Sequence, residues 1–409
     1  MVGKETSLGL ISLDIRCRFA MTFYNIFKSK KEVLSVENVM ISDSMRQQVE
    51  LGKEWEKKKI EHYTSSVKRY IKDAIISSAA YSGDIDELYY SSIYHFWVYG
   101  VNTKEFLFYD FKNKNHNQKK QYLSYKSRDD YYFHMNDIAA SHILNDKYET
   151  YVRYKDYYRR DVVRIGDEND YDAFCEFVER HPRCVYKPSC MGLGAGVDLI
   201  SFEGKKDLKK EFERIIRRGK VIKGMNPWRG FEDIDSSVLE ELIIEDERIN
   251  RLHPHSINCL RIPSVQSGDR TVIFHPYIKM GRSNNFLVDE RVGSILAGID
   301  EKTGELNTDG FDENGFKYTE HPDTGVIIKG FQIPRWDELV ELTNTLAKDI
   351  ANEGITYVGW DFALTPDGWS VVEGNFDGEF LGQLVCEAGH ADELSEIINW
   401  KPKKQFWWQ

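Results

Sequence analysis

The sequence predicts an α+β protein of two or three domains. Its 409 residues are long enough for that number at roughly 150 residues per domain. Apolar positions in 53–77 recur on one side of a helix, which predicts a mostly helical N-terminal region over residues 1–90. From about residue 140, short apolar runs bounded by turn residues predict strands mixed with one or two helices.

Each later element has its own signal. The predicted strands cover residues 183–187, 196–201, 237–244, 256–265 and 271–280. Apolar residues on one face predict an amphipathic helix over 334–353, which Gly354 ends. The last two strands, 355–364 and 369–374, predict a hairpin across Thr365-Pro366-Asp367-Gly368.

The composition excludes several classes of function. There are 55 Lys and Arg residues against 66 Asp and Glu, a net charge of −11, so a non-specific nucleic-acid partner is not expected. The six cysteines include no CxxC pair and no zinc-type spacing. No run approaches about 18 uninterrupted apolar residues, so we expect no spanning helix, no signal peptide and a cytoplasmic protein. We expect the Trp- and Lys-rich tail to dock on the body, and a peripheral membrane anchor is the alternative.

A glycine-rich loop follows a strand that ends in Lys187. Gly192, Gly194 and Gly196 would let backbone N–H groups approach an anion closely, and Lys187 adds a positive charge. The spacing differs from GxGxxG and from GxxxxGK[ST], which excludes the Rossmann and P-loop motifs. By itself the loop is equally compatible with a plain hairpin.

The C-terminal hairpin predicts a site for a divalent cation. With a three-residue loop of Pro366, Asp367 and Gly368, Asp361 lies opposite Glu373, and Asn375 lies on the same face. The flanking apolar residues predict a buried hairpin, where two acids without a cation are unfavourable. Two carboxylates and an amide oxygen suit Mg²⁺ that also holds substrate phosphates. A surface hairpin with scattered acids is the alternative.

Two adjacent acids, Glu240 and Glu241, interrupt the apolar run 238–244. At the end of a strand, such acids can accept hydrogen bonds from an amine or from ribose hydroxyls, while neighbouring backbone groups contact a purine edge. A solvated strand end is the alternative.

In this order, the motifs resemble those of ATP-grasp enzymes between about Asn145 and Gly389. The resemblance implies an ATP-grasp fold, in which two α+β subdomains grip ATP. It implies that Lys147, in Asn145-Asp146-Lys147-Tyr148, and Lys187 bind the ATP phosphates beneath a mobile glycine lid. The remaining implied roles are an adenine hinge at Glu240, Glu241 and Ile243, a ribose acid at Glu245 or Glu247, and two Mg²⁺ ions on Asp361, Glu373 and Asn375.

Another segment is similar to a narrower group. Asn258-Cys259-Leu260-Arg261-Ile262 resembles the Asn-Thr-Leu-Arg motif of the sugar-transfer-associated ATP-grasp subgroup, which occurs with bacterial capsule and surface-polysaccharide genes. From this resemblance, we expect Arg261 and Arg282 to steady a γ-phosphate or acyl-phosphate. The chain has Asp289-Glu290 and Gly293-Ser294 where the subgroup usually has Asp-Asn and Gly-Gly, a departure on the substrate side.

The resemblance implies an ADP-forming carboxylate–amine ligase that makes an amide through an acyl-phosphate. Its substrates would be small, sugar-linked acids and amines in surface-polysaccharide biosynthesis, and sugar-transfer enzymes could be partners. The alternatives are a phosphotransferase acting on a sugar or carboxylate and a non-catalytic ATP-binding scaffold. The implied division is a helical region (1–90), an aromatic-rich region (91–160), a lid subdomain (161–240), a metal-binding subdomain (241–395) and the tail (396–409).

Overall fold

The chain forms two compact units. In the computed structural model, the small unit comprises Met1–His134, Glu313–Phe316 and Cys386–Gln409, and the large unit comprises Met135–Asp312 and Lys317–Val385. The predicted helix within 53–77 and the end of the tail lie outside the residues that the structure describes, and the predicted domain boundaries stay predictions. The described residues are Leu88, Ser91, Ser92, Tyr94, His95, and 98–124, 127–191, 194, 196–204, 207–223, 236–283, 293–312, 316–376, 378 and 380–402.

The described helices of the small unit are short, and all of them except the one near the C-terminus lie in an aromatic-rich part of the chain. Phe111 is completely buried and packs against Tyr109 and Tyr122. The helices are α5 (Thr103–Phe108), η2 (Phe111–Asn113), α6 (His116–Lys120), α7 (Arg128–Met135, whose last residue belongs to the large unit) and α15 (Ala391–Ile397).

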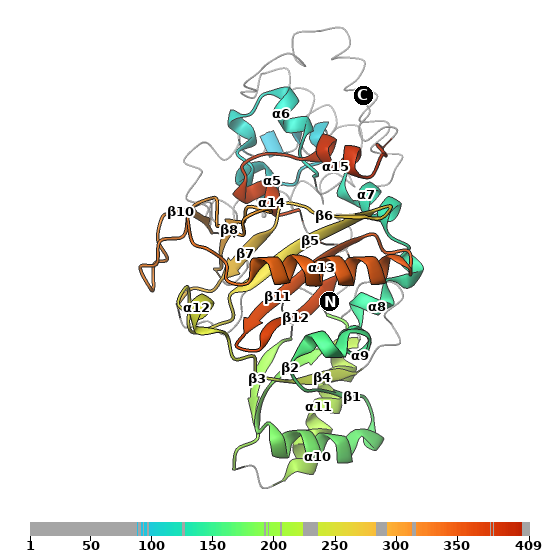
Figure 1. Ribbon diagram of the computed structural model, residues 1–409. Helices are drawn as coiled ribbons and strands as arrows, with labels where there is room; N and C mark the ends of the chain where they lie inside the picture. The colour runs from blue at the N-terminus through green and yellow to red at the C-terminus, as the bar shows by residue number, and fades with distance from the viewer. Residues whose placement is uncertain are drawn as a thin grey trace. The chain divides into compact units, whose positions relative to one another are not determined.

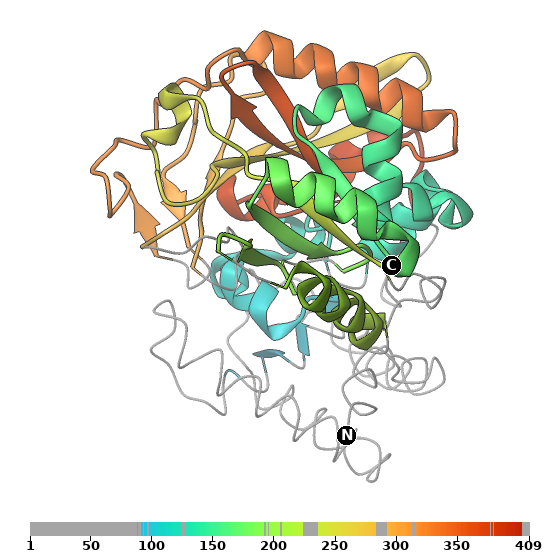
Figure 2. The ribbon, with the colours of Figure 1, turned by 90° about the horizontal axis from the view of Figure 1, so that it is seen from below.

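The large unit contains two antiparallel sheets (Figure 1). In the smaller sheet the strand order is β1-β4-β2-β3. Helices α10 and α11 pack on one of its faces and lie side by side when viewed from below (Figure 2). The bounds are β1 (Val162–Ile165), η4 (Glu168–Asp170), α10 (Tyr171–Arg180), β2 (Arg183–Pro188), β3 (Asp198–Ser201), α11 (Leu208–Lys223) and β4 (Ser237–Glu241).

The larger sheet has the order β10-β9-β8-β7-β5-β11-β12, with β6 paired to β5. Helix α13 (Trp336–Ala351) packs across β5, β6 and β11, and its apolar face joins the main core. The other elements are η3 (Ile138–Ala140), α8 (His142–Asn145), α12 (Glu247–Asn250), β5 (Cys259–Ser267), β6 (Arg270–Ile273), β7 (Tyr277–Met280), β8 (Ile295–Gly298), β9 (Gly310–Phe311), β10 (Lys317–Tyr318), β11 (Tyr357–Thr365), β12 (Gly368–Asn375) and α14 (Gly382–Val385).

Helix α9 (Lys147–Tyr158) joins the two sheets, because it packs against both β12 and β1. It begins at Lys147 because the Asp146 carboxylate caps its N-terminus by accepting a hydrogen bond from the Tyr148 N–H at 2.8 Å. Tyr154 on this helix meets the buried Trp360 of β11 edge to face, with ring centroids 5.5 Å apart. The helix therefore fixes Lys147 relative to both sheets.

The predicted helix over 334–353 is confirmed as α13, and Gly354 follows it with φ of +80°. The single strand predicted over 271–280 was wrong, because the chain forms β6 and β7 instead. His275 has φ of +50° and Pro276 has no N–H, so neither can continue a regular ladder.

The predicted hairpin is confirmed, but its three-residue loop was wrong. Thr365 pairs with Gly368, so that only Pro366 and Asp367 form the loop. The Thr365 hydroxyl donates to the Gly368 carbonyl at 2.8 Å, which fastens this tighter turn. A β-bulge then shifts the register: Phe362 faces Val371 and Asp361 faces Glu373, with Val372 as the extra residue. The bulge thus restores the predicted opposition of Asp361 and Glu373.

No helix within the described ranges has both the length and the apolar composition needed to cross a membrane.

We predict that Gly374→Ala destabilises the large unit. A Cβ at this position would lie 2.8 Å from the Leu144 Cδ2 and 3.0 Å from the Trp360 Cζ3, and both side chains are buried. Overpacking of this kind costs about 1–2 kcal/mol in the free energy of unfolding, which urea unfolding measures. In the matched control Gly166→Ala, the nearest atom would be 3.5 Å away, and we expect a change within about 0.5 kcal/mol. Equal effects of the two substitutions would contradict the packing described here.

Candidate active site

A buried ionic cluster of the site is centred on Asp361 of β11. Its carboxylate accepts hydrogen bonds from the Arg261 Nε at 2.6 Å and Nη2 at 3.0 Å, and from the Lys279 Nζ at 3.1 Å. Arg261 is the register partner of Asp361 on the neighbouring strand β5. Burial raises the pKa of Asp361, but the two cations outweigh burial and hold this pKa below its ordinary value. Asp361 is therefore a carboxylate with two positive partners.

Sequence reasoning missed Lys279, the second basic residue of this cluster. It lies in β7 between Ile278 and Met280, and it is the only charged residue in that strand. Burial and Arg261 lower its pKa, while Asp361 raises it, and the net shift is upward. A charged side chain inside an otherwise apolar strand was the available signal, because such a residue needs a partner.

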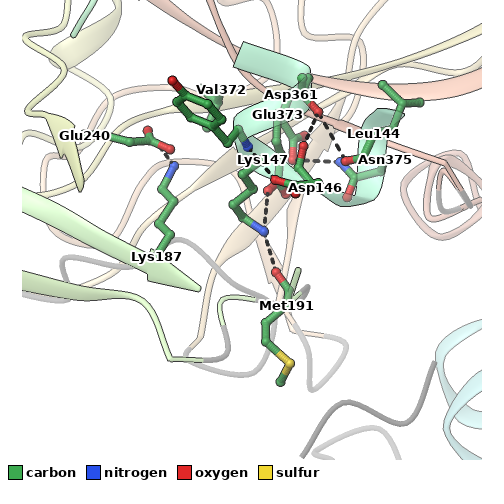
Figure 3. Close-up of polar contacts among 12 residues, drawn as sticks. Leu144, Asp146, Lys147, Lys187, Met191, Glu240, Asp361, Val372, Glu373 and Asn375 are labelled. Atoms are coloured by element: carbon green, nitrogen blue, oxygen red, sulfur yellow. Dashed lines mark hydrogen bonds and ion pairs between the residues drawn. The ribbon is translucent and has the colours of Figure 1, made fainter. Parts of the chain in front are cut away.

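Glu373 and Asn375 lie beside Asp361, as the sequence predicts (Figure 3). The Asn375 Nδ2 donates to the Gly359 carbonyl at 3.0 Å and lies 3.4 Å from the Asp361 Oδ2. The Glu373 side chain is 28% exposed, and its Oε2 lies 3.9 Å from the Lys147 Nζ. Two carboxylates and an amide are residues that could hold Mg²⁺ through hard oxygen ligands. Glu373 is the more accessible of the two acids, because both oxygens of Asp361 accept hydrogen bonds from cations.

Lys147 joins this carboxylate group to the base of the glycine-rich loop. Its Nζ donates to the Met191 carbonyl at 2.5 Å (Figure 3). Its backbone N–H donates to the Ser189 carbonyl at 2.8 Å. Gly194 and Gly196 have φ of +64° and +77°, the left-handed backbone that favours glycine. Gly192 lies outside the described residues. The predicted phosphate lysine therefore contacts both the loop and a predicted metal ligand.

Glu240 is a second buried carboxylate between two cations. It accepts from the Lys187 Nζ at 2.9 Å and from the Arg160 Nε at 3.0 Å (Figure 3 shows the lysine contact). Burial raises the pKa of Glu240, but Lys187 and Arg160 outweigh it and lower the pKa to about 2. Glu240 thus holds the predicted phosphate lysine Lys187 in place.

The other predicted hinge residues follow β4. The Glu241 carboxylate accepts from the Asp161 N–H at 3.0 Å, and Ile243 is half-buried beyond the strand end. Of the two acids that the sequence left open, Glu247 is exposed in the first turn of α12. Glu245 instead accepts from the Asn258 N–H at 2.5 Å and Nδ2 at 2.8 Å. The Asn-Cys-Leu-Arg segment therefore contacts Glu245 through its first residue and Asp361 through its last.

Arg282 belongs to a different cluster from Arg261. Its Nη1 donates to the buried Asp312 carboxylate at 2.9 Å and to the Tyr318 hydroxyl at 2.8 Å. A Cβ on Gly293 would lie 2.6 Å from the Arg282 Nη2, so the chain crosses the guanidinium closely at this glycine. The two predicted catalytic arginines consequently have different carboxylate partners.

Comparison with family models gives a match over residues 126–399 to the sugar-transfer-associated ATP-grasp family. The chain belongs to this family. The match covers well over half of the chain and includes both sheets of the large unit. No curated protein sequence matches the chain significantly.

The chain is also similar to solved structures of ATP-grasp ligases, at low sequence identity. The ATP-grasp ligase PsnB with a minimal precursor is 16% identical, with a TM-score of 0.34, over 66% of this chain and 59% of PsnB. D-alanyl-alanine synthetase A from Vibrio cholerae is 12% identical, with a TM-score of 0.38, over 64% of this chain and 67% of the synthetase. D-alanine–D-alanine ligase from Helicobacter pylori is 14% identical, with a TM-score of 0.39, over 65% of this chain and 64% of the ligase. The chain thus spans less than two thirds of the length of PsnB.

We predict that Glu245 makes the stability of the protein depend on pH. Burial raises the pKa of Glu245 from 4.5 to about 8. The folded state then binds this proton more tightly than the unfolded state, so the free energy of unfolding falls as the pH rises between these two values. Relative to Glu245→Gln, the wild type should lose about 4 kcal/mol between pH 5 and pH 9 in urea unfolding, at about 1.4 kcal/mol for each unit of pKa shift. A difference between the two proteins that is the same at both pH values would contradict this assignment.

Proposed function

We propose that this ATP-grasp protein is an ATP- and Mg²⁺-dependent carboxylate–amine ligase that forms an amide and releases ADP and phosphate. The observation that carries the proposal is the position of Lys147, whose Nζ lies between the base of the glycine-rich loop and Glu373. A lysine in this position can hold phosphates that a loop covers and that a metal on Glu373 also contacts. Membership in the ATP-grasp family supports the same chemistry.

In this proposal, ATP binds between the two sheets of the large unit. Lys147 and Lys187 hold the α- and β-phosphates, and the loop with Gly192, Gly194 and Gly196 closes over them. The end of β4 supplies the adenine hinge at Glu240, Glu241 and Ile243. Glu247 is the proposed ribose acid, and Glu245 is the alternative because its carboxylate is already engaged by Asn258.

Asp361, Glu373 and Asn375 are the proposed ligands of two Mg²⁺ ions. When bound, the ions would neutralise phosphate charge and align the γ-phosphate for transfer. The chain itself places positive charge beside this position, because Arg261 and Lys279 both contact Asp361. Arg261 is proposed to offset the charge of the transferred group, and Arg282, fixed by Asp312, to act on the substrate side.

The proposed reaction has two steps and no covalent enzyme intermediate. A substrate carboxylate oxygen attacks the γ-phosphorus, the bond to the ADP oxygen breaks, and an acyl-phosphate forms. A substrate amine then attacks the acyl carbon, phosphate leaves, and the amine loses a proton. A closed glycine loop would keep water away from the acyl-phosphate between these steps.

The family name supports substrates linked to sugars. We propose an acid and an amine, either of which carries a sugar, joined in the cytoplasm during surface-polysaccharide biosynthesis, with sugar-transfer enzymes as partners.

We predict that ADP formation requires ATP, Mg²⁺, a carboxylic acid and an amine together. The test incubates the protein with panels of sugar acids, amino acids and amino sugars, with and without amines, and measures ADP and the products by mass spectrometry. An amide that appears only in the complete mixture supports the ligase. ADP formed equally well without an amine, with a stable phosphorylated product, would show a phosphotransferase, and no turnover would favour the scaffold.

We predict that Glu373→Gln lowers Mg²⁺-dependent ADP release by roughly a hundredfold or more, because a metal site contributes several kcal/mol to transition-state stabilisation. Metal-free ATP binding should stay within about threefold of the wild type. Glu373 is chosen over Asp361 because Asp361→Asn would also deprive two cations of their buried partner.

The matched control is Glu353→Gln, which removes an acid that pairs with Arg153 on the surface. This variant should keep wild-type turnover. Undiminished ADP release by Glu373→Gln would remove Glu373 from the metal site.

A further inference from the structure

Arg160 is a buried side chain that none of the roles proposed above includes. Its side chain is 2% exposed, and its guanidinium carbon lies 4.4 Å from the centre of the Tyr158 ring. The guanidinium contacts five acceptor groups, which are the Glu240 carboxylate, the Ser370 hydroxyl and the carbonyls of Tyr158, Val371 and Val372.

One edge of this guanidinium contacts the smaller sheet. Its Nε and Nη2 lie 3.0 Å and 2.9 Å from the Glu240 Oε2, the same oxygen that accepts from the Lys187 Nζ at 2.9 Å. One carboxylate oxygen is thus shared by two cations. Arg160 takes part of the negative charge that would otherwise act on Lys187 alone.

The end of the guanidinium, formed by Nη1 and Nη2, contacts the larger sheet at the bulge of β12. Nη1 donates to the Val371 carbonyl at 2.6 Å, and Nη2 donates to the Val372 carbonyl at 3.2 Å. These residues are the last regular residue before the bulge and the extra residue itself. The next residue is Glu373, so the two hydrogen bonds fix the backbone that presents this carboxylate.

A purely structural arginine would account for the carbonyl contacts, because buried carbonyls need donors. A purely structural role does not explain why the same guanidinium also donates to Glu240, the carboxylate that pairs with Lys187. The contacts of Arg160 join β4 to β12. On β4, Glu240 pairs with the proposed phosphate-binding Lys187, and on β12, Glu373 is a proposed metal ligand.

We propose that Arg160 is a positioning residue with two separable effects on nucleotide binding, an inference that rests on the proposed function. By sharing Glu240, it weakens the hold of this acid on Lys187 and leaves the ammonium available to a phosphate. By bonding to the bulge, it sets the position of Glu373 and so the contribution of Mg²⁺ to nucleotide affinity.

The test measures ADP binding by calorimetry, in EDTA and in Mg²⁺, for the wild type, Arg160→Gln and Arg160→Lys. Arg160→Gln should weaken metal-free binding by about tenfold and also reduce the gain in affinity from Mg²⁺. Arg160→Lys keeps the charge at Glu240 but cannot also reach both carbonyls, because an ammonium lacks the planar fork. It should restore metal-free affinity to within about threefold of the wild type without restoring the gain from Mg²⁺.

Arg159→Gln is the matched control, because Arg159 precedes Arg160 and donates to Trp369 of the same strand, away from the bulge. It should leave both quantities unchanged. If a thermal-unfolding assay shows that Arg160→Gln does not fold, Arg160→Lys alone tests the inference. Its metal-free affinity for ADP should then be close to that of the wild type, while its gain in affinity from Mg²⁺ should be smaller.

Three results would overturn the inference. Folded Arg160 variants with wild-type affinity in both conditions would remove the positioning role alone. If ADP affinity falls equally in EDTA and in Mg²⁺, and Arg160→Lys does not restore it, Arg160 is a purely structural residue. A wild type that binds no ADP would overturn the proposed function together with this inference.

Discussion

Two buried carboxylates, each neutralised by two cationic side chains, are the interaction on which the candidate site of the large unit depends. Asp361 is held by Arg261 and Lys279, and Glu240 is held by Lys187 and Arg160. Removing Asp361 or Glu240 would leave two cations without their buried acid, which typically costs about 3–5 kcal/mol. The strands that carry these residues must therefore keep their register for the fold to persist.

This arrangement also has an electrostatic consequence for the ligand. Two cations and one anion leave each cluster with one positive charge in excess, although the whole chain carries a net charge of −11. A polyphosphate placed between the clusters would meet locally positive potential in surroundings that are otherwise acidic. The compensation of the carboxylates and the attraction of a nucleotide thus depend on the same side chains.

Local patterns in the sequence were sufficient for part of this organisation. The amphipathic pattern predicted α13, and the alternation of residues in the hairpin predicted that Asp361 faces Glu373. The route to this pairing was wrong, because a two-residue loop and a bulge together replace the expected three-residue loop. Loop length and bulges depend on small energy differences between turns, which the residue types alone did not decide.

Residues whose roles depend on distant partners were not predictable in the same way. Lys279 stands in no motif, and the pair Arg159-Arg160 resembles the family pattern without indicating a role for either residue. The carboxylate partners of Lys279 and Arg160 lie 82 and 80 positions away in the chain. Only the strand order β7-β5-β11 and the passage of the chain from α9 to β1 bring these groups together. Lys147 is an intermediate case, because the sequence predicted its phosphate role but not its contact with Met191.

A crystal structure of the protein with a non-hydrolysable ATP analogue and Mg²⁺ would show where the nucleotide and its ions bind. We expect phosphates between Lys147 and Lys187, with the ions bound by Asp361, Glu373 and Asn375. A nucleotide bound elsewhere, or ions held by other residues, would contradict this expectation.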